Sequence, residues 1–75
     1  MKNRLMSEKK AEDNKDVLFI IQNFKTEGVG NERLKVILSI GKEYENRCHK
    51  RGFSSNRGNR DMIKACELLL EEMNQ

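Results

Sequence analysis

The sequence predicts an all-α protein, a small three-helix bundle with helices at approximately 14–27, 32–51 and 60–74. In each segment, apolar residues recur at spacings of three and four, which is the spacing of one helical face. Proline is absent and only 5% of the residues are aromatic, so turn and strand formers are scarce. The 75 residues are enough for one domain. We place this domain at 13–75, after a polar segment, 1–12, that we expect to be a flexible arm.

The middle segment, 32–51, carries the clearest helical signals. Asn31 is a suitable N-cap because its side chain can accept hydrogen bonds from the free amides of the first turn. Gly52 is expected to adopt the left-handed conformation that ends many helices, followed by an apolar contact from Phe53. The apolar face of this helix comprises Leu34, Ile37, Gly41, Tyr44 and Cys48.

Two further features concern how the middle helix packs. Gly41 lies on the apolar face, which predicts the close approach of another backbone. Val36 and Ile40 lie on a different flank, so we expect this helix to touch more than one neighbour.

The first segment, 14–27, contains the longest apolar run of the chain, residues 17–21. Periodicity alone does not separate a short helix from a buried strand in such a run. An N-cap at Asp13 or Asn14 and the absence of any partner strand favour a helix. Gly28 is expected to end it, and about three residues then lead to the middle segment. So short a connection predicts that the two helices are antiparallel neighbours.

A loop rich in glycine, serine and asparagine, 52–59, precedes the last segment, and Asn59 is expected to cap the helix. This helix is apolar over a wide arc, so it should lie against two surfaces, one of which is compatible with a homodimer. Met62, Leu69 and Met73 form the candidate surface for a second copy or another partner, because methionine adapts to varied surfaces. The alternative is that this stripe belongs to the ordinary core.

A helix-turn-helix arrangement, with 60–74 as the DNA-reading helix, is a competing interpretation. The loop before this helix, 52–59, is longer than the three to four residues that are usual in a helix-turn-helix, however. The polar side of this helix is also acidic, which would repel phosphate. We therefore favour the bundle.

The net charge of +3 is concentrated in residues 47–60, which contain no acid. Antiparallel packing would bring the end of the middle helix and the anion-binding amides of the last helix to one pole of the molecule. We predict that this pole binds nucleic acid or an acidic protein surface; the alternative is a solvated loop. Phe53 beside Arg51 is either a stacking platform for a base or, as we favour, a cap residue tucked onto the helix. The candidate binding residues, called here the basic pole, are Arg47, Lys50, Arg51, Arg57 and Arg60.

The cysteine and histidine residues do not predict a metal site or a catalytic site. Cys48, His49 and Cys66 are too few for the four ligands of a structural zinc site. Neighbours such as Cys48 and His49 also point about 100° apart on a helix. Both cysteines lie on apolar faces and are predicted to be small core residues. No phosphate-binding glycine loop is present. We expect no enzymatic activity, no cofactor and no metal.

No apolar run approaches the roughly 20 residues of a membrane span, and no signal peptide is visible. We expect a soluble, cytoplasmic protein with reduced cysteines and no membrane partner. The expected function is that of a small non-enzymatic binding or regulatory protein that uses the basic pole. The alternative is a protein–protein interaction adaptor or inhibitor that acts through exposed apolar helix faces, independently of nucleic acid.

Overall fold

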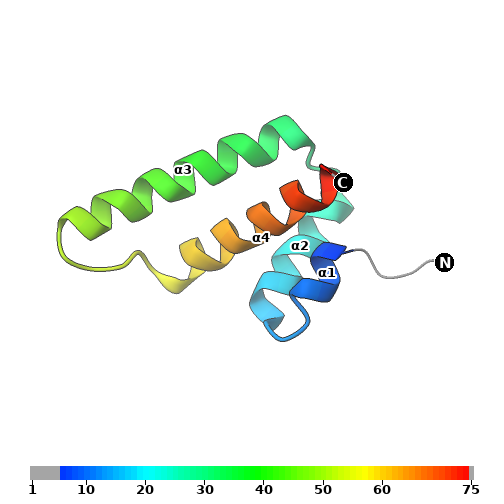
Figure 1. The fold of residues 1–75 in the computed structure, drawn as a ribbon, viewed down its shortest axis with the longest axis horizontal. Helices are drawn as coiled ribbons and strands as arrows, with labels where there is room; N and C mark the ends of the chain where they lie inside the picture. The colour runs from blue at the N-terminus through cyan, green and yellow to red at the C-terminus, as the bar shows by residue number, and fades with distance from the viewer. Residues whose placement is uncertain (1–5, 75) are drawn as a thin grey trace.

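The computed structural model describes residues 6–74, and these form helices joined by turns and loops, with no strand. The molecule measures 47 × 26 × 20 Å, and α3 and α4 lie side by side along its long axis (Figure 1). The predicted all-α bundle is confirmed, with one short helix more than predicted. The helices are α1 (Met6–Lys10), α2 (Lys15–Glu27), α3 (Asn31–Lys50) and α4 (Arg57–Met73).

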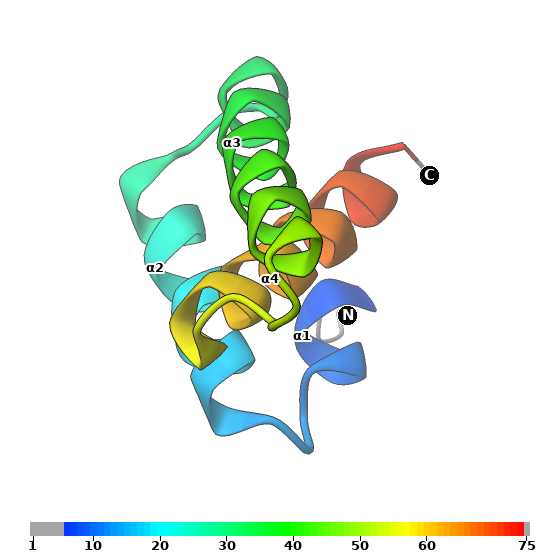
Figure 2. The same cartoon turned by 90° about the vertical axis from the view of Figure 1, so that its left-hand side faces the viewer.

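The last helix, α4, is the centre of the bundle. It packs against each of the other three helices, whereas the backbones of α2 and α3 do not pack against each other (Figure 2). The prediction that these two helices are neighbours is therefore wrong. The wide apolar arc of α4 accommodates both of them. Half of the buried core comes from this helix: the core comprises Ala11, Val17, Ile21, Leu34, Ala65, Cys66, Leu68 and Leu69.

Residues 6–12 form α1 and a turn, where the sequence predicts part of a flexible arm. Ser7 is fully buried, and both its amide and its hydroxyl donate to the Glu72 carboxylate of α4. Lys10 Nζ lies 2.9 Å from Glu71 Oε1. A helix of five residues is not stable alone, so α1 depends on partners far along the chain that periodicity does not reveal. Residues 1–5 of the predicted arm lie outside the described residues.

Glu72 also links α1 and α4 to α2, because Lys25 Nζ lies 3.2 Å from its Oε2 atom. Burial by itself raises the pKa of the Glu72 carboxyl. The hydrogen bonds from Ser7 and the nearby Lys25 ammonium outweigh burial, so the net pKa is lowered. Glu72 is thus held as a carboxylate at the junction of three helices.

Both ends of α2 follow the sequence prediction. The Asn14 side chain accepts hydrogen bonds from the amides of Asp16 and Val17, each at 3.1 Å. At the other end, Gly28 has φ +70°, and the Val29 amide donates to the carbonyl oxygen of Phe24 at 3.0 Å. These bonds satisfy backbone groups that the helix termini leave free.

The starts of α3 and α4 differ from the prediction. Gly30 is the N-cap of α3 and makes no side-chain cap bond, so Asn31 is the first helical residue rather than the cap. Asn56 caps α4 by accepting from the Asn59 amide at 2.8 Å, so this helix begins three residues earlier than predicted. The Asn59 side chain donates instead to the Gly41 carbonyl oxygen of α3 at 3.0 Å. An asparagine expected at a helix end therefore joins two helices.

Candidate functional site

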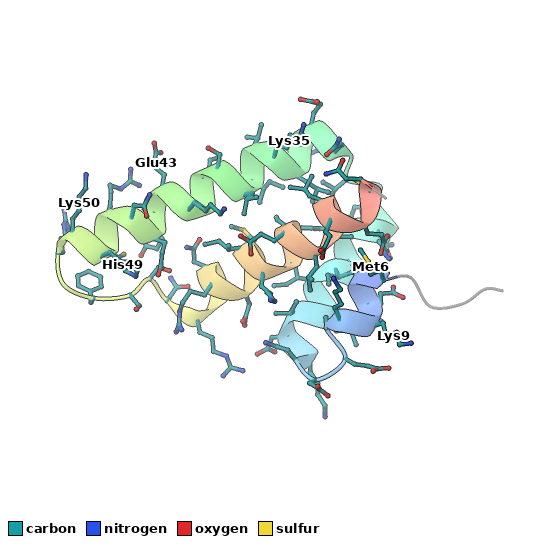
Figure 3. The ribbon with its side chains drawn as sticks, viewed as in Figure 1. Met6, Lys9, Lys35, Glu43, His49 and Lys50 are labelled. Atoms are coloured by element: carbon teal, nitrogen blue, oxygen red, sulfur yellow. The ribbon has the colours of Figure 1, made fainter. Side chains whose placement is uncertain are left out.

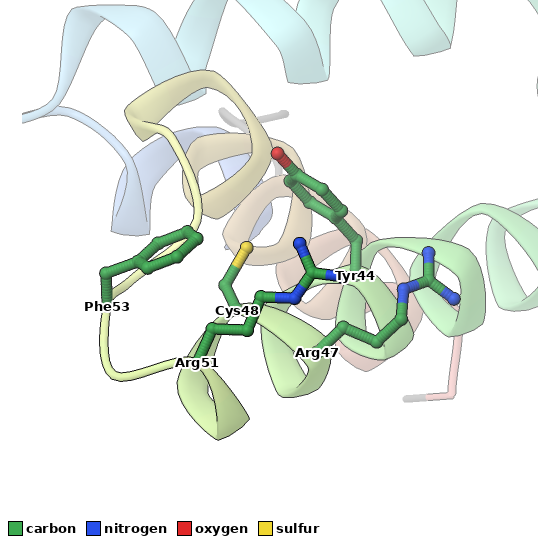
Figure 4. Close-up of a pocket in the computed structure, with 5 residues that line it drawn as sticks. All are labelled: Tyr44, Arg47, Cys48, Arg51 and Phe53. Carbon is green, nitrogen blue, oxygen red and sulfur yellow. The ribbon is translucent and has the colours of Figure 1, made fainter.

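The end of α3 is shaped by a hydrogen-bonded turn. Gly52 has φ +91°, the left-handed conformation that the sequence predicts, and its amide donates to the carbonyl oxygen of His49 at 3.0 Å. The Phe53 amide donates to the carbonyl oxygen of Cys48 at 3.1 Å. The chain therefore doubles back at the helix end, and the Phe53 ring lies near Cys48 (Figure 4).

Glu45 holds the loop between α3 and α4. Its Oε1 atom accepts from the Ser55 amide at 2.9 Å and from the Ser55 hydroxyl, while its Oε2 atom lies 2.7 Å from His49 Nε2. The hydroxyl bond, followed by the amide bond, lowers the pKa of the Glu45 carboxyl because both stabilise its charged form. Sequence analysis missed this residue. The four-residue spacing to His49 is a signal for one contact, but the Ser55 contact depends on the path of the loop.

Three of the predicted cations gather at the end of α3, where they complement the negative end of the helix dipole. Arg47 Nη1 lies 3.9 Å from Glu43 Oε1. Lys50 extends from the side of α3 that faces away from α4 (Figure 3). Neither Lys50 nor Arg51 forms an ion pair with any residue in the described part of the chain. We call Arg47, Lys50 and Arg51 the basic tip.

The other two members of the predicted basic pole do not join the basic tip. Arg57 Nη2 lies 2.7 Å from Asp16 Oδ2 of α2, and its Nε lies 3.7 Å from Asp61 Oδ2. The Nε of Arg60 donates to the carbonyl oxygen of Ser55 at 3.2 Å. Asp16 also brings a negative charge close to the start of α4, where the sequence predicts anion-binding amides. The basic pole of five residues is therefore reduced to the three of the basic tip.

A surface hollow of about 160 Å³ lies against the basic tip. In the view of Figure 4, Cys48 Sγ lies between the Phe53 and Tyr44 rings, the Arg51 guanidinium lies beside the Tyr44 ring, and Arg47 is directed away from them. Phe53 is 54% exposed and Tyr44 is 39% exposed, although the sequence places both in apolar contacts. The lining residues are Tyr44, Arg47, Cys48, Arg51 and Phe53. The end of α3 thus presents two aromatic rings together with arginine.

The predicted partner surface on α4 is largely core. Leu69 is only 2% exposed, and Met62 packs against the core with its terminal methyl beside Gly41. Met73 is exposed. Because α2, α3 and α1 all pack on α4, Met62 and Leu69 are used inside the chain, and Met73 is the one residue of the predicted surface that is exposed.

A different apolar stripe is exposed, on α3. Ile40 is 62% exposed, Val36 one turn earlier is also exposed, and Tyr44 continues the line toward the basic tip. The expectation that Val36 and Ile40 touch a second helix is wrong, because α4 is the one described helix that packs against α3.

Cys48 and Cys66 are buried free thiols, as the sequence predicts for small core residues. Burial, with a smaller contribution from the Glu67 charge, raises the pKa of the Cys66 thiol to about 11. This thiol is therefore protonated and unreactive at neutral pH. Among residues 6–74, no group of three or more histidine, cysteine or acidic side chains is placed to hold a metal ion.

No protein-family model, curated protein or solved structure matches this chain. None of the four described helices combines the length and the apolar character that crossing a membrane requires.

Proposed function

We propose that this protein is a non-enzymatic binding protein that binds nucleic acid through the basic tip. The observation that carries the proposal is the grouping of Arg47, Lys50 and Arg51 at one end of α3, with a single acid, Glu43, 3.9 Å from Arg47. Elsewhere, cations such as Lys25 lie close to acids within the fold. Side chains without such partners are available to phosphate groups.

The chemistry of the basic tip suits phosphate. Two of its three residues are arginines, whose planar guanidinium groups can donate two hydrogen bonds to one phosphate. The loop that follows is held to α3 by Glu45, so the end of the helix is presented on a fixed support. Three cations are few, so we expect weak binding that depends strongly on salt.

The test is the salt dependence of binding to a labelled oligonucleotide, followed by fluorescence anisotropy. Three phosphate contacts predict a slope of about −2 in a plot of log affinity against log salt for a single strand. The triple variant Arg47→Glu, Lys50→Glu and Arg51→Glu should bring this slope close to zero.

A matched control carries the same change in net charge at other exposed cations: Arg33→Glu, Lys35→Glu and Lys64→Glu. The control should retain most of the affinity, because these side chains lie outside the basic tip. Absence of binding at 50 mM salt, or an equal loss in both triple variants, would overturn the proposal.

The exposed stripe on α3 supports a second candidate, interaction with another protein or with a second copy of this chain. Val36 and Ile40 lie one turn apart and are uncovered within the described residues. A homodimer through this stripe would appear as a concentration-dependent mass in sedimentation equilibrium. Ile40→Glu should abolish it without affecting nucleic-acid binding, whereas a monomer at all concentrations would exclude the dimer.

A further inference from the structure

Resting on the proposed function, we propose that the hollow beside the basic tip takes an unpaired base. The protein would then bind single-stranded nucleic acid in preference to a duplex, and with little sequence preference. The observation is that two aromatic rings, Phe53 and Tyr44, line one hollow together with Arg51 (Figure 4). Base stacking on aromatic side chains is the usual source of sequence-tolerant affinity for single strands.

The position of the Phe53 ring is set by the backbone on both sides. Its amide is bonded to the carbonyl oxygen of Cys48, and Gly52 before it has the left-handed conformation. Two residues later, Ser55 is bonded to Glu45. The ring is nevertheless 54% exposed. A cap residue that only covered the helix would turn more of its apolar surface inward, so Phe53 has ring surface free for a ligand.

The size and chemistry of the hollow fit one flat ring. At about 160 Å³ it is smaller than the roughly 300–1,000 Å³ of small-molecule pockets, so it can hold only part of a ligand against the surface. Its base contains the buried Cys48 side chain, and its rim carries the Arg51 guanidinium, which can stack on a base. Apart from the two guanidinium groups and the Tyr44 hydroxyl, the lining side chains carry no nitrogen or oxygen atom that could read base edges.

Single strands should be favoured because stacking needs an open base face. In a duplex, the base faces are covered by their neighbours and only the edges are accessible in the grooves. A duplex can therefore reach the basic tip through phosphate but cannot use Phe53 or Tyr44. The phosphates on either side of a stacked base would lie within reach of Arg47 and Arg51, which line the same hollow, and Lys50 precedes Arg51 at the end of α3.

The experiment compares a labelled single strand of mixed sequence with its duplex at 50 mM salt, by fluorescence anisotropy. The double variant Tyr44→Leu and Phe53→Leu keeps every charge and retains apolar side chains at both positions. We expect it to lower single-strand affinity at least about fivefold, the contribution of one stacked base, and to leave duplex affinity unchanged. Phe19→Leu is the matched control, because Phe19 is an exposed ring on α2, away from the hollow.

Tyr44 supplies a second readout that needs no variant. The chain has one tyrosine and no tryptophan, so its intrinsic emission reports on Tyr44 alone. We expect the single strand to quench this emission, after correction for absorption with free tyrosinamide, and the duplex to leave it unchanged. This measurement decides the proposal even if the double variant does not fold.

The outcomes separate the two proposals. If the charge variant of the basic tip loses binding but the ring variant binds both oligonucleotides normally, the basic tip binds phosphate and the stacking proposal is overturned. Equal affinity for duplex and single strand, or unquenched Tyr44 emission, would also overturn it. If neither oligonucleotide binds, the proposed function itself fails; binding of a polyglutamate peptide in its place would then identify an acidic protein surface as the target.

Discussion

Gly41 is the residue at which α4 lies against the backbone of α3. It is buried, and side chains of Met62 and Ile63 occupy the space where a side chain at this position would lie. Asn59 donates to its carbonyl oxygen at 3.0 Å. Gly41 is closely packed, but the groups that approach it are side chains of α4 and not, as the sequence predicts, another backbone.

Substitutions at Gly41 should show how large a side chain the contact between α3 and α4 can accommodate. An added Cβ would lie 2.8 Å from the Met62 terminal methyl and 3.1 Å from Ile63 Cγ1. The end of a methionine side chain moves readily, and alanine favours a helix over glycine by about 1 kcal/mol. We expect Gly41→Ala to change the free energy of unfolding by less than ~1 kcal/mol. Gly41→Leu should lower it by about 1–3 kcal/mol in urea denaturation.

The control is Ser39→Leu, which adds the same side chain at an exposed position of α3. It should leave the free energy of unfolding nearly unchanged. If Gly41→Leu proved as stable as Ser39→Leu, α4 would not lie as close to α3 as the structure places it.

At the scale of elements, the loop between α3 and α4 depends on one carboxylate. Glu45 accepts from Ser55 twice and lies beside His49. Its pKa is lowered from the ordinary value of 4.5, first by the Ser55 hydroxyl and then by the Ser55 amide. A lowered pKa means that this contribution to stability is fully present above about pH 4.5 and is lost as the pH falls through the folded-state pKa.

Acid should therefore release the loop before it unfolds the bundle. We expect the protection of the Ser55 amide against hydrogen exchange, measured by NMR and corrected for the intrinsic rate, to fall below about pH 4.5. In Glu45→Gln this protection should already be weak at neutral pH and should change little with pH. Glu43→Gln is the control, because the ion pair of Glu43 within the described residues is with Arg47, at 3.9 Å, and not with the loop. Unchanged protection in Glu45→Gln would contradict this account.

At the scale of the whole molecule, α1 is attached through Ser7, which is buried against Glu72. Ser7→Ala keeps the size of the side chain and the amide bond but removes the hydroxyl bond to a charged acceptor. We expect it to lower the free energy of unfolding by about 1.5–3 kcal/mol and to speed proteolytic cleavage between α1 and α2. Ser54→Ala, at an exposed loop position, should do neither. Equal cleavage rates for the two variants would show that α1 is held by other contacts.

Local signals in the sequence predicted local features of the fold. The sequence indicates Gly28 and Gly52 as helix ends, and Asn14 as one of two candidate caps beside Asp13, because each acts within a few residues of its own position. Features that depend on distant partners were missed. Ser7 donates to a carboxylate 65 residues away. The Asn59 side chain donates to a carbonyl oxygen of α3 and does not cap α4.

The candidate site also combines features set by local sequence with features that depend on distant partners. Arg47 and Lys50 lie in the last turn of α3 and Arg51 is its C-cap, so their grouping could be read from spacing. Arg57 lies 41 residues from Asp16, and nothing in the sequence shows that they meet. The exposure of Phe53 could not be predicted either, because it depends on how the loop returns to α4.

The central place of α4 has a consequence for how the chain acquires its fold during synthesis. α4 is the last of the described helices to be made, and α3 has no other described helix to pack against. While the ribosome is still adding α4, α3 can therefore make no native helix–helix contact, and its apolar residues remain open to chaperones and to other nascent chains. Domains whose early segments pack on one another can begin to fold during translation; in this protein the long helix that carries the basic tip must wait until α4 has been made.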